Sequence, residues 1–290
     1  MFVLNNRTGK SILLTSTLLS GGIIVVVFSV LLMQSLGAIQ GAGLGLISTE
    51  WNPALGQFGI LSMLYGTVMV TGIALLLAVP VGISCAILIS EVLPSRFRII
   101  VKSTLEVLAG IPSIIYGLIG VALFSVWIGN IFELSTGRTI LTAGIILAIM
   151  ILPIIITLTE EALQNVPSHY RESALALGLY KYEVITGTLL SLAKRDIVIA
   201  VLLGLGRALG ETMAVMLVIG SIDRIPDPIL NVFVPGQTIT SKLGREITES
   251  AFGSLHFSSM IFMGFLLMIV VFAITILSQR YIKSGDRLHE

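Results

Sequence analysis

The sequence predicts an all-α, polytopic membrane protein with six transmembrane helices. Apolar residues make up 55% of the chain and charged residues only 11%, and the mean hydropathy is +1.02. So little polar surface cannot cover a soluble globule of 290 residues, which makes lipid the solvent for most of the chain. Because lipid offers no hydrogen bonds to a backbone, the segments that cross it have to be helical.

Six runs reach the length of about 20 mainly apolar residues that crosses roughly 30 Å of hydrocarbon. In chain order they are Ser11–Leu36, Phe58–Ser90, Val107–Phe132, Thr139–Thr159, Ile197–Ile222 and Ser250–Gln279. Only the fifth contains charged residues, Arg207 and Glu211. The first is too long for the apolar core of a signal peptide and lacks an Ala-x-Ala cleavage site, so we expect it to be retained as a span.

Basic residues gather on one side of this topology. The connecting segments on that side contain twelve: Arg7, Lys10, Arg96, Arg98, Lys102, Arg171, Lys181, Lys194, Arg195, Arg280, Lys283 and Arg287. Those on the opposite side contain four: Arg138, Arg224, Lys242 and Arg245. An excess of Lys and Arg marks the cytoplasmic side of a membrane protein. The sequence therefore predicts that both termini are cytoplasmic.

The chain shows no internal repeat and no low-complexity tail, so we expect one main membrane domain at residues 58–281. Residues 1–57 would precede it with a cytoplasmic segment, the first span and an outer loop, and residues 282–290 would form a cytoplasmic tail. Residues 223–249 contain proline and glycine turn signals, which predict an irregular outer loop with one short helix.

The cytoplasmic loop at residues 160–196 predicts two short helices. Ser168 is a suitable helix start and Gly178 a suitable residue just past a helix end. A second helical segment is expected at Lys181–Leu192, before the next span. The resulting helix-turn-helix is either a solvated connector or a docking element for another protein.

Motifs for metal or nucleotide chemistry are missing from the sequence. The single Cys85 excludes an intramolecular disulfide and a multi-thiolate metal site, and His169, His256 and His289 lie far apart. No Gly-x-x-x-x-Gly-Lys-Ser/Thr loop occurs. We expect this chain to bind no cofactor, and any nucleotide-driven work to depend on another polypeptide.

Two charges lie near the middle of the fifth span. Each costs about 2.5–3.5 kcal/mol at the membrane centre, so both are expected to face protein or a water-filled path. As residues i and i+4 of one helix, Arg207 and Glu211 share a face and can pair. Gly206 and Gly210 beside them leave room for another helix to approach closely. The pair either fixes helix packing only, or forms an anion path in which Glu211 keeps binding to Arg207 weak.

Span three contains a predicted kink near mid-membrane. Pro112 removes a helix hydrogen bond, and Gly110 loosens the same turn. Ser113 and Tyr116 can supply hydroxyl groups there, although a kink that only shapes packing is an equal alternative. Glu106 is expected to be solvated or paired with Lys102.

Three stretches resemble a known family. Glu172-Ser173-Ala174 followed by Gly178 resembles the EAA motif of ABC-importer permeases, whose coupling helix docks on the ATPase subunit. Residues 109–117 (Ala-Gly-Ile-Pro-Ser-Ile-Ile-Tyr-Gly) and 206–214 (Gly-Arg-Ala-Leu-Gly-Glu-Thr-Met-Ala) resemble phosphate-specific transport permeases. The second of these is more similar to the PstC type than to the paralogous PstA type. The chain therefore resembles a PstC-type permease subunit.

The resemblance implies a type I ABC importer permease fold at residues 58–281, with a coupling loop at 160–196, in a bacterial or archaeal cytoplasmic (inner) membrane. It implies a path for inorganic phosphate formed by Arg207, Glu211, Ser113 and Tyr116. Packing and gating would involve Gly206, Gly210 and Pro112. Coupling to the ATPase would involve Glu172, Ser173, Ala174 and Gly178.

The implied partners are a PstA-type paralogous permease, a PstB-type ATPase dimer that carries ATP and Mg, and a PstS-type extracytoplasmic phosphate-binding protein. Membrane lipids are also expected, and nucleic acid is not. The chain itself would be a transport subunit and not an enzyme, within an ABC-type phosphate transporter ATPase. Transport of another oxyanion is an alternative. A passive anion channel is a second one, although a channel has no need of a coupling loop.

Overall fold

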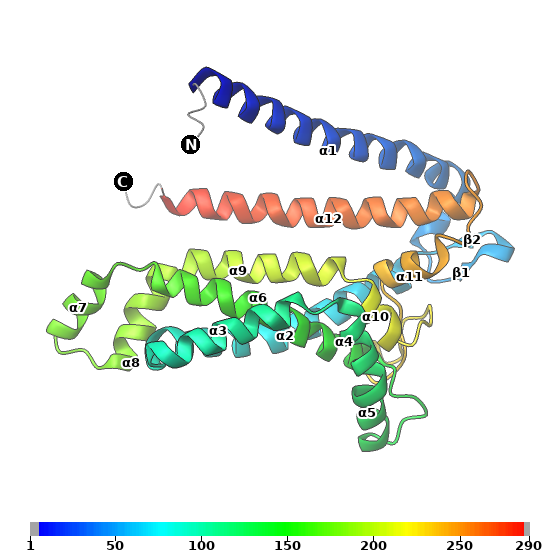
Figure 1. The fold of residues 1–290 in the computed structure, drawn as a ribbon. Coiled ribbons are helices and arrows are strands. Elements are labelled where there is room, and N and C mark those ends of the chain that lie inside the picture. Colours follow the sequence, from blue (N-terminus) through cyan, green and yellow to red (C-terminus); the bar gives the residue numbers. More distant parts are fainter. Residues whose placement is uncertain (1–5, 287–290) are drawn as a thin grey trace.

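The computed structural model describes residues 6–286, which form a helical bundle with one small β-hairpin (Figure 1). The helices are α1 (Asn6–Ala42), α2 (Leu61–Ile87), α3 (Ser95–Gly110), α4 (Ser113–Ile119), α5 (Ser125–Ile131), α6 (Ile140–Gln164), α7 (Ser168–Ala176), α8 (Lys181–Glu183), α9 (Leu190–Gly210), α10 (Met213–Val218), α11 (Ile239–Glu246) and α12 (Leu255–Asp286). The hairpin consists of β1 (Trp51–Asn52) and β2 (Gln57–Phe58), which pair antiparallel. Arg287 and His289, in the predicted tail, lie outside the described residues.

Short 3₁₀ and π segments adjoin these elements. Two 3₁₀ turns flank β1, at Gly43–Ile47 and Pro53–Leu55. Three π segments extend helices: Leu88–Val92 follows α2, Gly120–Phe124 joins α4 to α5, and Val184–Leu189 joins α8 to α9. The chain from Lys181 to Gly210 is therefore helical throughout.

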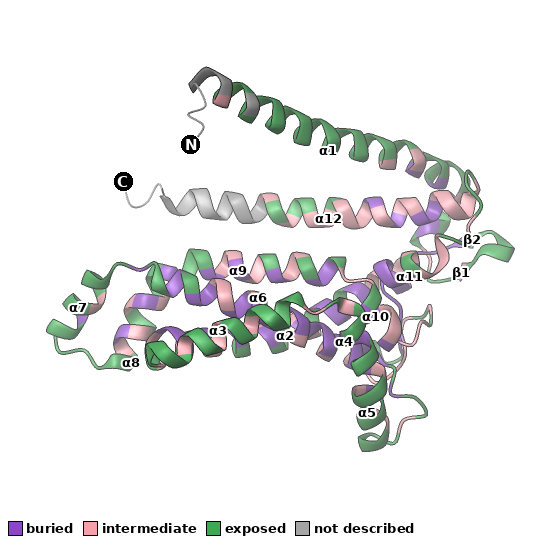
Figure 2. Cartoon of the chain, in the orientation of Figure 1, coloured by how far each residue is buried: buried purple, intermediate pink, exposed green. Residues whose placement is uncertain are grey.

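The centre of the bundle is α6. It packs against both α2 and α9, and Figure 2 shows it buried along most of its length. Glycines permit these contacts: a Cβ at Gly144 would lie 2.5 Å from Ile73 of α2, and one at Gly204 of α9 would lie 2.9 Å from Ile155. Close helix approach through small residues is the packing that membrane helices use.

The surface of the bundle is suited to lipid. Figure 2 shows α1 exposed along most of its length, and its main helix contact is with α12. Leu18 of α1 is 73% exposed and Met33 72%. Exposed apolar side chains in such number are costly in water and favourable in hydrocarbon. The chain is a multi-pass membrane protein.

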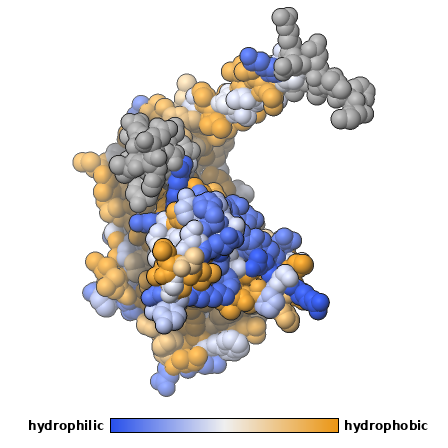
Figure 3. Space-filling view, turned by 90° about the vertical axis from the view of Figure 1, so that its left-hand side faces the viewer, coloured by the Kyte–Doolittle hydropathy of each residue, from blue (hydrophilic) through white to orange (hydrophobic). Residues whose placement is uncertain are grey.

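The two ends of the bundle differ in character. The α7 end carries α7, α8 and the turn between α2 and α3, and α1 begins and α12 ends there (Figure 1). The α11 end carries α11 and the β-hairpin. Figure 3 looks onto the α7 end and shows hydrophilic side chains crowded at its centre with apolar ones beside them. The segments predicted to be rich in Arg and Lys thus meet at one end.

The predicted all-α polytopic class is confirmed, but the count of six continuous spans is not. Among residues 6–286, five helical stretches are long and apolar enough to cross a membrane: Gly9–Ile47, Leu61–Val92, Ser113–Ile131, Ile140–Gln164 and Leu255–Ile276. The predicted fifth span, Ile197–Ile222, is divided, because α9 ends at Gly210, Glu211 is extended (ψ 123°) and α10 begins at Met213.

The predicted kink in span three is a complete break, and it lies at the start of the apolar helix. Ile111 is extended (ψ 128°) between α3 and α4. A residue that precedes proline is pushed out of helical geometry by the proline ring, which explains this conformation before Pro112. Beyond the break, α4 and α5 turn away from the direction of the other long helices (Figure 1).

Both predicted loops have the expected form. The helix-turn-helix is confirmed, with α7 beginning at Ser168 and the second helical segment at Lys181. Gly178 ends the first helix with φ +83°, a conformation that glycine adopts without steric cost. The loop at residues 223–249 is irregular and contains the single short helix α11.

Candidate translocation path and coupling surface

The charged residues of the predicted fifth span do not pair. Arg207 lies in the last turn of α9 and is exposed, whereas Glu211 lies past the helix end. The Glu211 carboxylate instead accepts a hydrogen bond from the Ala214 backbone N–H, at 3.0 Å, in the first turn of α10. No ion pair joins Arg207 to Glu211 in the described part of the chain. The expected pairing on one helix face is wrong, because that face ends at the break.

Arg207 lies deep within the apolar part of the chain. It is eleven residues beyond Asp196, which at 1.5 Å per residue corresponds to roughly 16 Å of helix. A Cβ built at Gly206 or Gly210 meets nothing within 4 Å. The expected close helix approach at these glycines is thus not made by any described residue of this chain, and the surface around Arg207 is open.

The two helix breaks are neighbours. Gly117 of α4 packs on α10, and a Cβ at Gly117 would lie 3.0 Å from the Cα of Ala214. The hydroxyl of Tyr116 donates to the Leu108 carbonyl at 2.7 Å, across the α3–α4 break. Tyr116 and Ala208, the residue after Arg207, belong to one buried cluster. The same hydrogen bond shows that Tyr116 also holds the break together.

Ser113 and Pro112 occupy the same break. Pro112 is exposed just before α4, and Ser113, the first residue of α4, is partly exposed. The structure thus gathers the candidate residues of span three and span five at two adjacent interruptions. Glu211 belongs to this region through its backbone as well, since its carbonyl accepts from the Thr240 hydroxyl of α11 at 2.8 Å.

The predicted coupling residues divide into buried and exposed positions on α7. Ala174 is 6% exposed and packs with Leu163, Val184 and Leu189. Glu172, Ser173 and Gly178 are exposed.

Apolar residues lie beside these exposed coupling residues, at the turn that follows α7. Leu177 is 82% exposed and Tyr180 71%. An exposed surface that combines apolar and charged side chains at the end of a membrane protein is typical of a protein-binding site.

Arg171, whose structural role was not predicted from the sequence, holds α7 in place. Arg171 of α7 forms an ion pair with Glu91 at the end of α2, with 2.7 Å between Nη2 and Oε1. The same Nη2 donates to the Leu163 carbonyl of α6 at 2.9 Å. The position of α7 is thus fixed to α2 and α6. Glu91 lies 80 residues from Arg171, so local sequence spacing carries no signal of this contact.

Replacing Arg171 by methionine should loosen α7 while leaving the membrane bundle assembled. The change removes hydrogen bonds to a charged group that contribute about 1–3 kcal/mol. Protease cleavage within residues 167–180 should become faster, as measured by limited proteolysis. The exposed Arg96, changed to methionine, is the control and should leave cleavage unchanged. Equal cleavage of the Arg171 variant and the wild type would show that the anchor has no effect.

Of the two alternatives for Glu106, the solvated one agrees with the structure, because Glu106 is exposed and Lys102 has another partner. Its Nζ lies 2.6 Å from Oε2 of Glu160, a residue of α6 that is 1% exposed. Since a buried carboxylate needs a nearby cation, Lys102 compensates Glu160 in preference to Glu106. The contact ties α3 to α6 near the α7 end.

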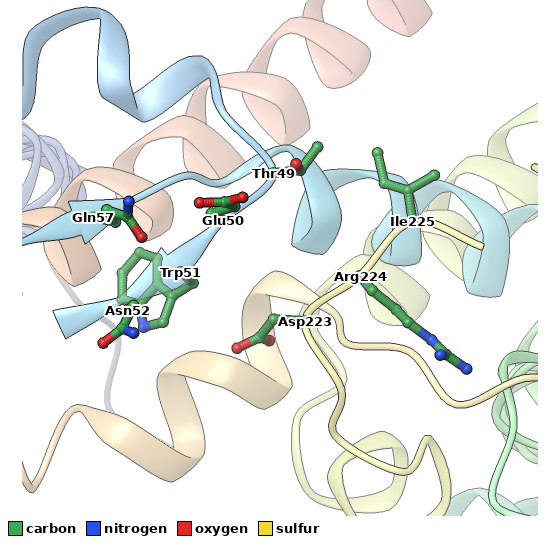
Figure 4. Close-up of a pocket in the computed structure, with 8 residues that line it drawn as sticks. All are labelled: Thr49, Glu50, Trp51, Asn52, Gln57, Asp223, Arg224 and Ile225. Carbon is green, nitrogen blue, oxygen red and sulfur yellow. The ribbon is translucent and has the colours of Figure 1, made fainter. Parts of the chain in front are cut away.

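The α11 end contains a polar cavity of about 470 Å³ (Figure 4). It lies between the β-hairpin and the segment that follows α10. Its lining residues are Thr49, Glu50, Trp51, Asn52, Gln57, Asp223, Arg224 and Ile225. The sequence motifs did not indicate this cavity, because its two walls are far apart along the chain.

Comparison with known proteins identifies the family. Residues 78–285 match the family described as binding-protein-dependent transport system inner membrane component. The chain is 35% identical to the phosphate transport system permease protein PstC of Mesorhizobium japonicum, over 97% of this chain and 90% of that protein. It is 38% identical to the protein of the same name from Xylella fastidiosa strain Temecula1, over 80% and 76% of the two chains.

The fold matches a solved ABC transporter. A chain of the MetNI methionine ABC transporter in an inward-facing conformation superposes with a TM-score of 0.60 and 18% identity, over 81% of this chain and 99% of that chain. At this identity the likeness concerns the fold, which is that of a type I ABC importer permease. Such a permease is a transport subunit that works with a separate ATPase and a substrate-binding protein. The chain belongs to the family of inner membrane components of binding-protein-dependent transport systems.

Proposed function

We propose that this chain is the PstC-type permease subunit of an importer for inorganic phosphate. The observation that carries the proposal is Arg207, which is exposed, forms no ion pair among the described residues and lies where two helix breaks meet in an apolar domain. The names of the relatives, at 35% and 38% identity, support phosphate as the anion.

The geometry suits transient anion binding. Arginine presents several donors in a plane and keeps its charge at any physiological pH, which matches a tetrahedral oxyanion. Glu211 does not neutralise it, because its carboxylate binds the start of α10. Weak binding follows instead from the open surface, where water competes for the guanidinium and Ser113 and Tyr116 add only neutral hydroxyls.

This chain supplies one side of the path. Gly206 and Gly210 leave open space at α9, which a PstA-type paralogous subunit would face. The two breaks, at Pro112 and at Glu211, supply the places where the helices can change direction during gating. Residues 58–281 would form this transmembrane unit, preceded by residues 1–57 and followed by the tail at 282–290.

The energy of ATP hydrolysis would be transmitted to this chain at the α7 end. A PstB-type ATPase dimer would bind Glu172, Ser173 and the exposed apolar side chains beside Gly178, with ATP and Mg bound to that dimer and no cofactor on this chain. Ala174 and the Arg171–Glu91 ion pair would pass movement of α7 to α2 and α6.

The orientation follows from the same arrangement. The α7 end, with most of the Arg and Lys, would face the cytoplasm together with both termini. The α11 end would then face outward, toward a PstS-type phosphate-binding protein.

Competition between anions tests the choice of substrate. Vesicles that contain the complete complex should take up labelled phosphate, and an excess of unlabelled phosphate should suppress that uptake. The same excess of sulfate should leave it nearly unchanged. Equal suppression by sulfate would identify a permease for oxyanions in general.

A further inference from the structure

A buried lysine lies at the centre of the α11 end. The side chain of Lys242 is only 2% exposed and forms ion pairs with Asp223 and, at 2.6 Å, with Glu246. Its Nζ also lies 5.1 Å from the centre of the Trp51 ring. A buried ammonium group is stable only when such partners replace its water. Lys242 therefore depends on three separate segments of the chain.

These segments are α11, the strand-like stretch after α10, and the β-hairpin. Asp223 follows α10, and Trp51 of β1 donates from its indole N–H to Glu246 at 3.1 Å. Burial raises the pKa of Glu246, but hydrogen bonds from Lys242, Arg245 and Trp51 and the charge of Lys242 outweigh it, so the net shift is downward. Glu246 is thus ionised at neutral pH and holds the three segments together.

The opposite face of α11 contacts the helix break in the path. Thr240, two residues before Lys242, donates its hydroxyl to the Glu211 carbonyl at 2.8 Å. A Cβ at Gly244 would lie 2.6 Å from Cγ2 of Thr212, so α11 packs directly on the break. One short helix therefore contacts both the break and the cluster around Lys242.

The same cluster forms part of the wall of the outer cavity. Figure 4 shows Trp51 and Asp223 on its two sides, and both contact Lys242 or its partner Glu246. A shift of Trp51 or Asp223 at this cavity moves a partner of Lys242. Because α11 is one continuous helix from Ile239 to Glu246, the movement reaches Thr240 and the Glu211 carbonyl.

We propose that α11 transmits contact at the outer cavity to the α9–α10 break, with Lys242 as the positioning residue that joins α11 to the cavity walls. The inference rests on the proposed function, because the contact in question is that of the phosphate-loaded binding protein. Lys242 touches no substrate in this account. Lys242 instead determines how strongly the binding protein stimulates the transporter.

The test uses the complete complex in vesicles, with ATP hydrolysis measured in the absence and presence of phosphate-loaded binding protein. Changing Lys242 to methionine should leave basal hydrolysis near the wild-type rate and reduce stimulation by the binding protein about tenfold, within the usual range of coupling between sites. Lys242→Arg, which keeps the charge, should restore most of the stimulation. A purely structural role would lower basal hydrolysis and stimulation together.

A second variant covers the case in which Lys242→Met does not assemble. Thr240→Val keeps the shape and removes the hydrogen bonds of the hydroxyl to the Glu211 carbonyl and the Thr238 hydroxyl, so it should also reduce stimulation. Thr248, which is exposed, provides the control, and Thr248→Val should behave as wild type. Assembled variants at Thr240 and Lys242 with wild-type stimulation overturn the inference alone. A wild-type complex that takes up no phosphate overturns the proposed function, and the inference with it.

Discussion

Replacing Arg207 by glutamine should abolish ATP-driven phosphate uptake while the transporter still assembles. Arg207 is exposed at the end of α9 and forms no ion pair in the described part of the chain, so its loss leaves no buried charge without a partner. Glutamine keeps a polar side chain but removes the fixed positive charge that draws an anion into an apolar region. The measurement is uptake of labelled phosphate into vesicles, together with copurification of the ATPase.

Two further variants define the role of this charge. Lys at position 207 keeps the charge without the planar set of donors, so it should retain part of the uptake. Arg96, which is exposed near the α7 end, is the matched control, and its change to glutamine should have little effect. Normal uptake by the Arg207→Gln variant would mean that Arg207 only shapes the protein.

Replacing Glu172 by lysine, which reverses its charge, should also abolish uptake, but through loss of ATPase binding. Glu172 is exposed on α7, so a lysine there should not disturb the Ala174 packing or the Arg171–Glu91 ion pair. The expected defect is loss of ATPase binding, because charge reversal at an interface both removes a favourable contact and adds repulsion. Copurification of the tagged chain with the ATPase measures it.

The control for this variant is Glu161→Lys. Glu161 is also exposed near the α7 end and within the predicted loop at 160–196, but it lies on α6, outside α7 and the turn at Gly178. The Glu161→Lys variant should bind the ATPase and transport phosphate as the wild type does. If Glu172→Lys copurifies with the ATPase at the wild-type level and transports normally, α7 is not the docking helix.

The parts of the fold that sequence predicts are those set by local physical chemistry. The lengths of the apolar runs predict five of the spans, since crossing hydrocarbon has a fixed length. Pro112 predicts an interruption because the ring acts on its own neighbours, although the result is a full break and not a mid-membrane kink. Gly178 marks a helix end for a similar local reason.

The break at Glu211 could not be predicted in this way. Nothing in residues 206–214 forbids a continuous helix, and Arg207 and Glu211 have the spacing of a helical pair. The chain leaves the helix where Glu211 can bind the start of α10 and its carbonyl can accept from Thr240, 29 residues away. Whether the helix continues or breaks at Glu211 therefore depends on tertiary contacts, which are present only in the folded chain.

Most of the ionic contacts could not be predicted from the sequence for the same reason. Arg171 binds Glu91 and Lys102 binds Glu160, each across a long stretch of sequence. The pair of Lys242 and Glu246 has i, i+4 spacing and could have been noticed, but the burial of Lys242 could not. Sequence thus predicts candidate residues for the path and the coupling helix, but not the contacts that position them.

The most direct test of a phosphate importer driven through α7 is accumulation in sealed vesicles. Vesicles with the complete complex, ATP trapped on the α7 side and phosphate-loaded binding protein outside should concentrate labelled phosphate above the external level. Vesicles without ATP should not. Equal entry with and without ATP, stopping at the external concentration, would contradict the account and indicate a passive anion channel.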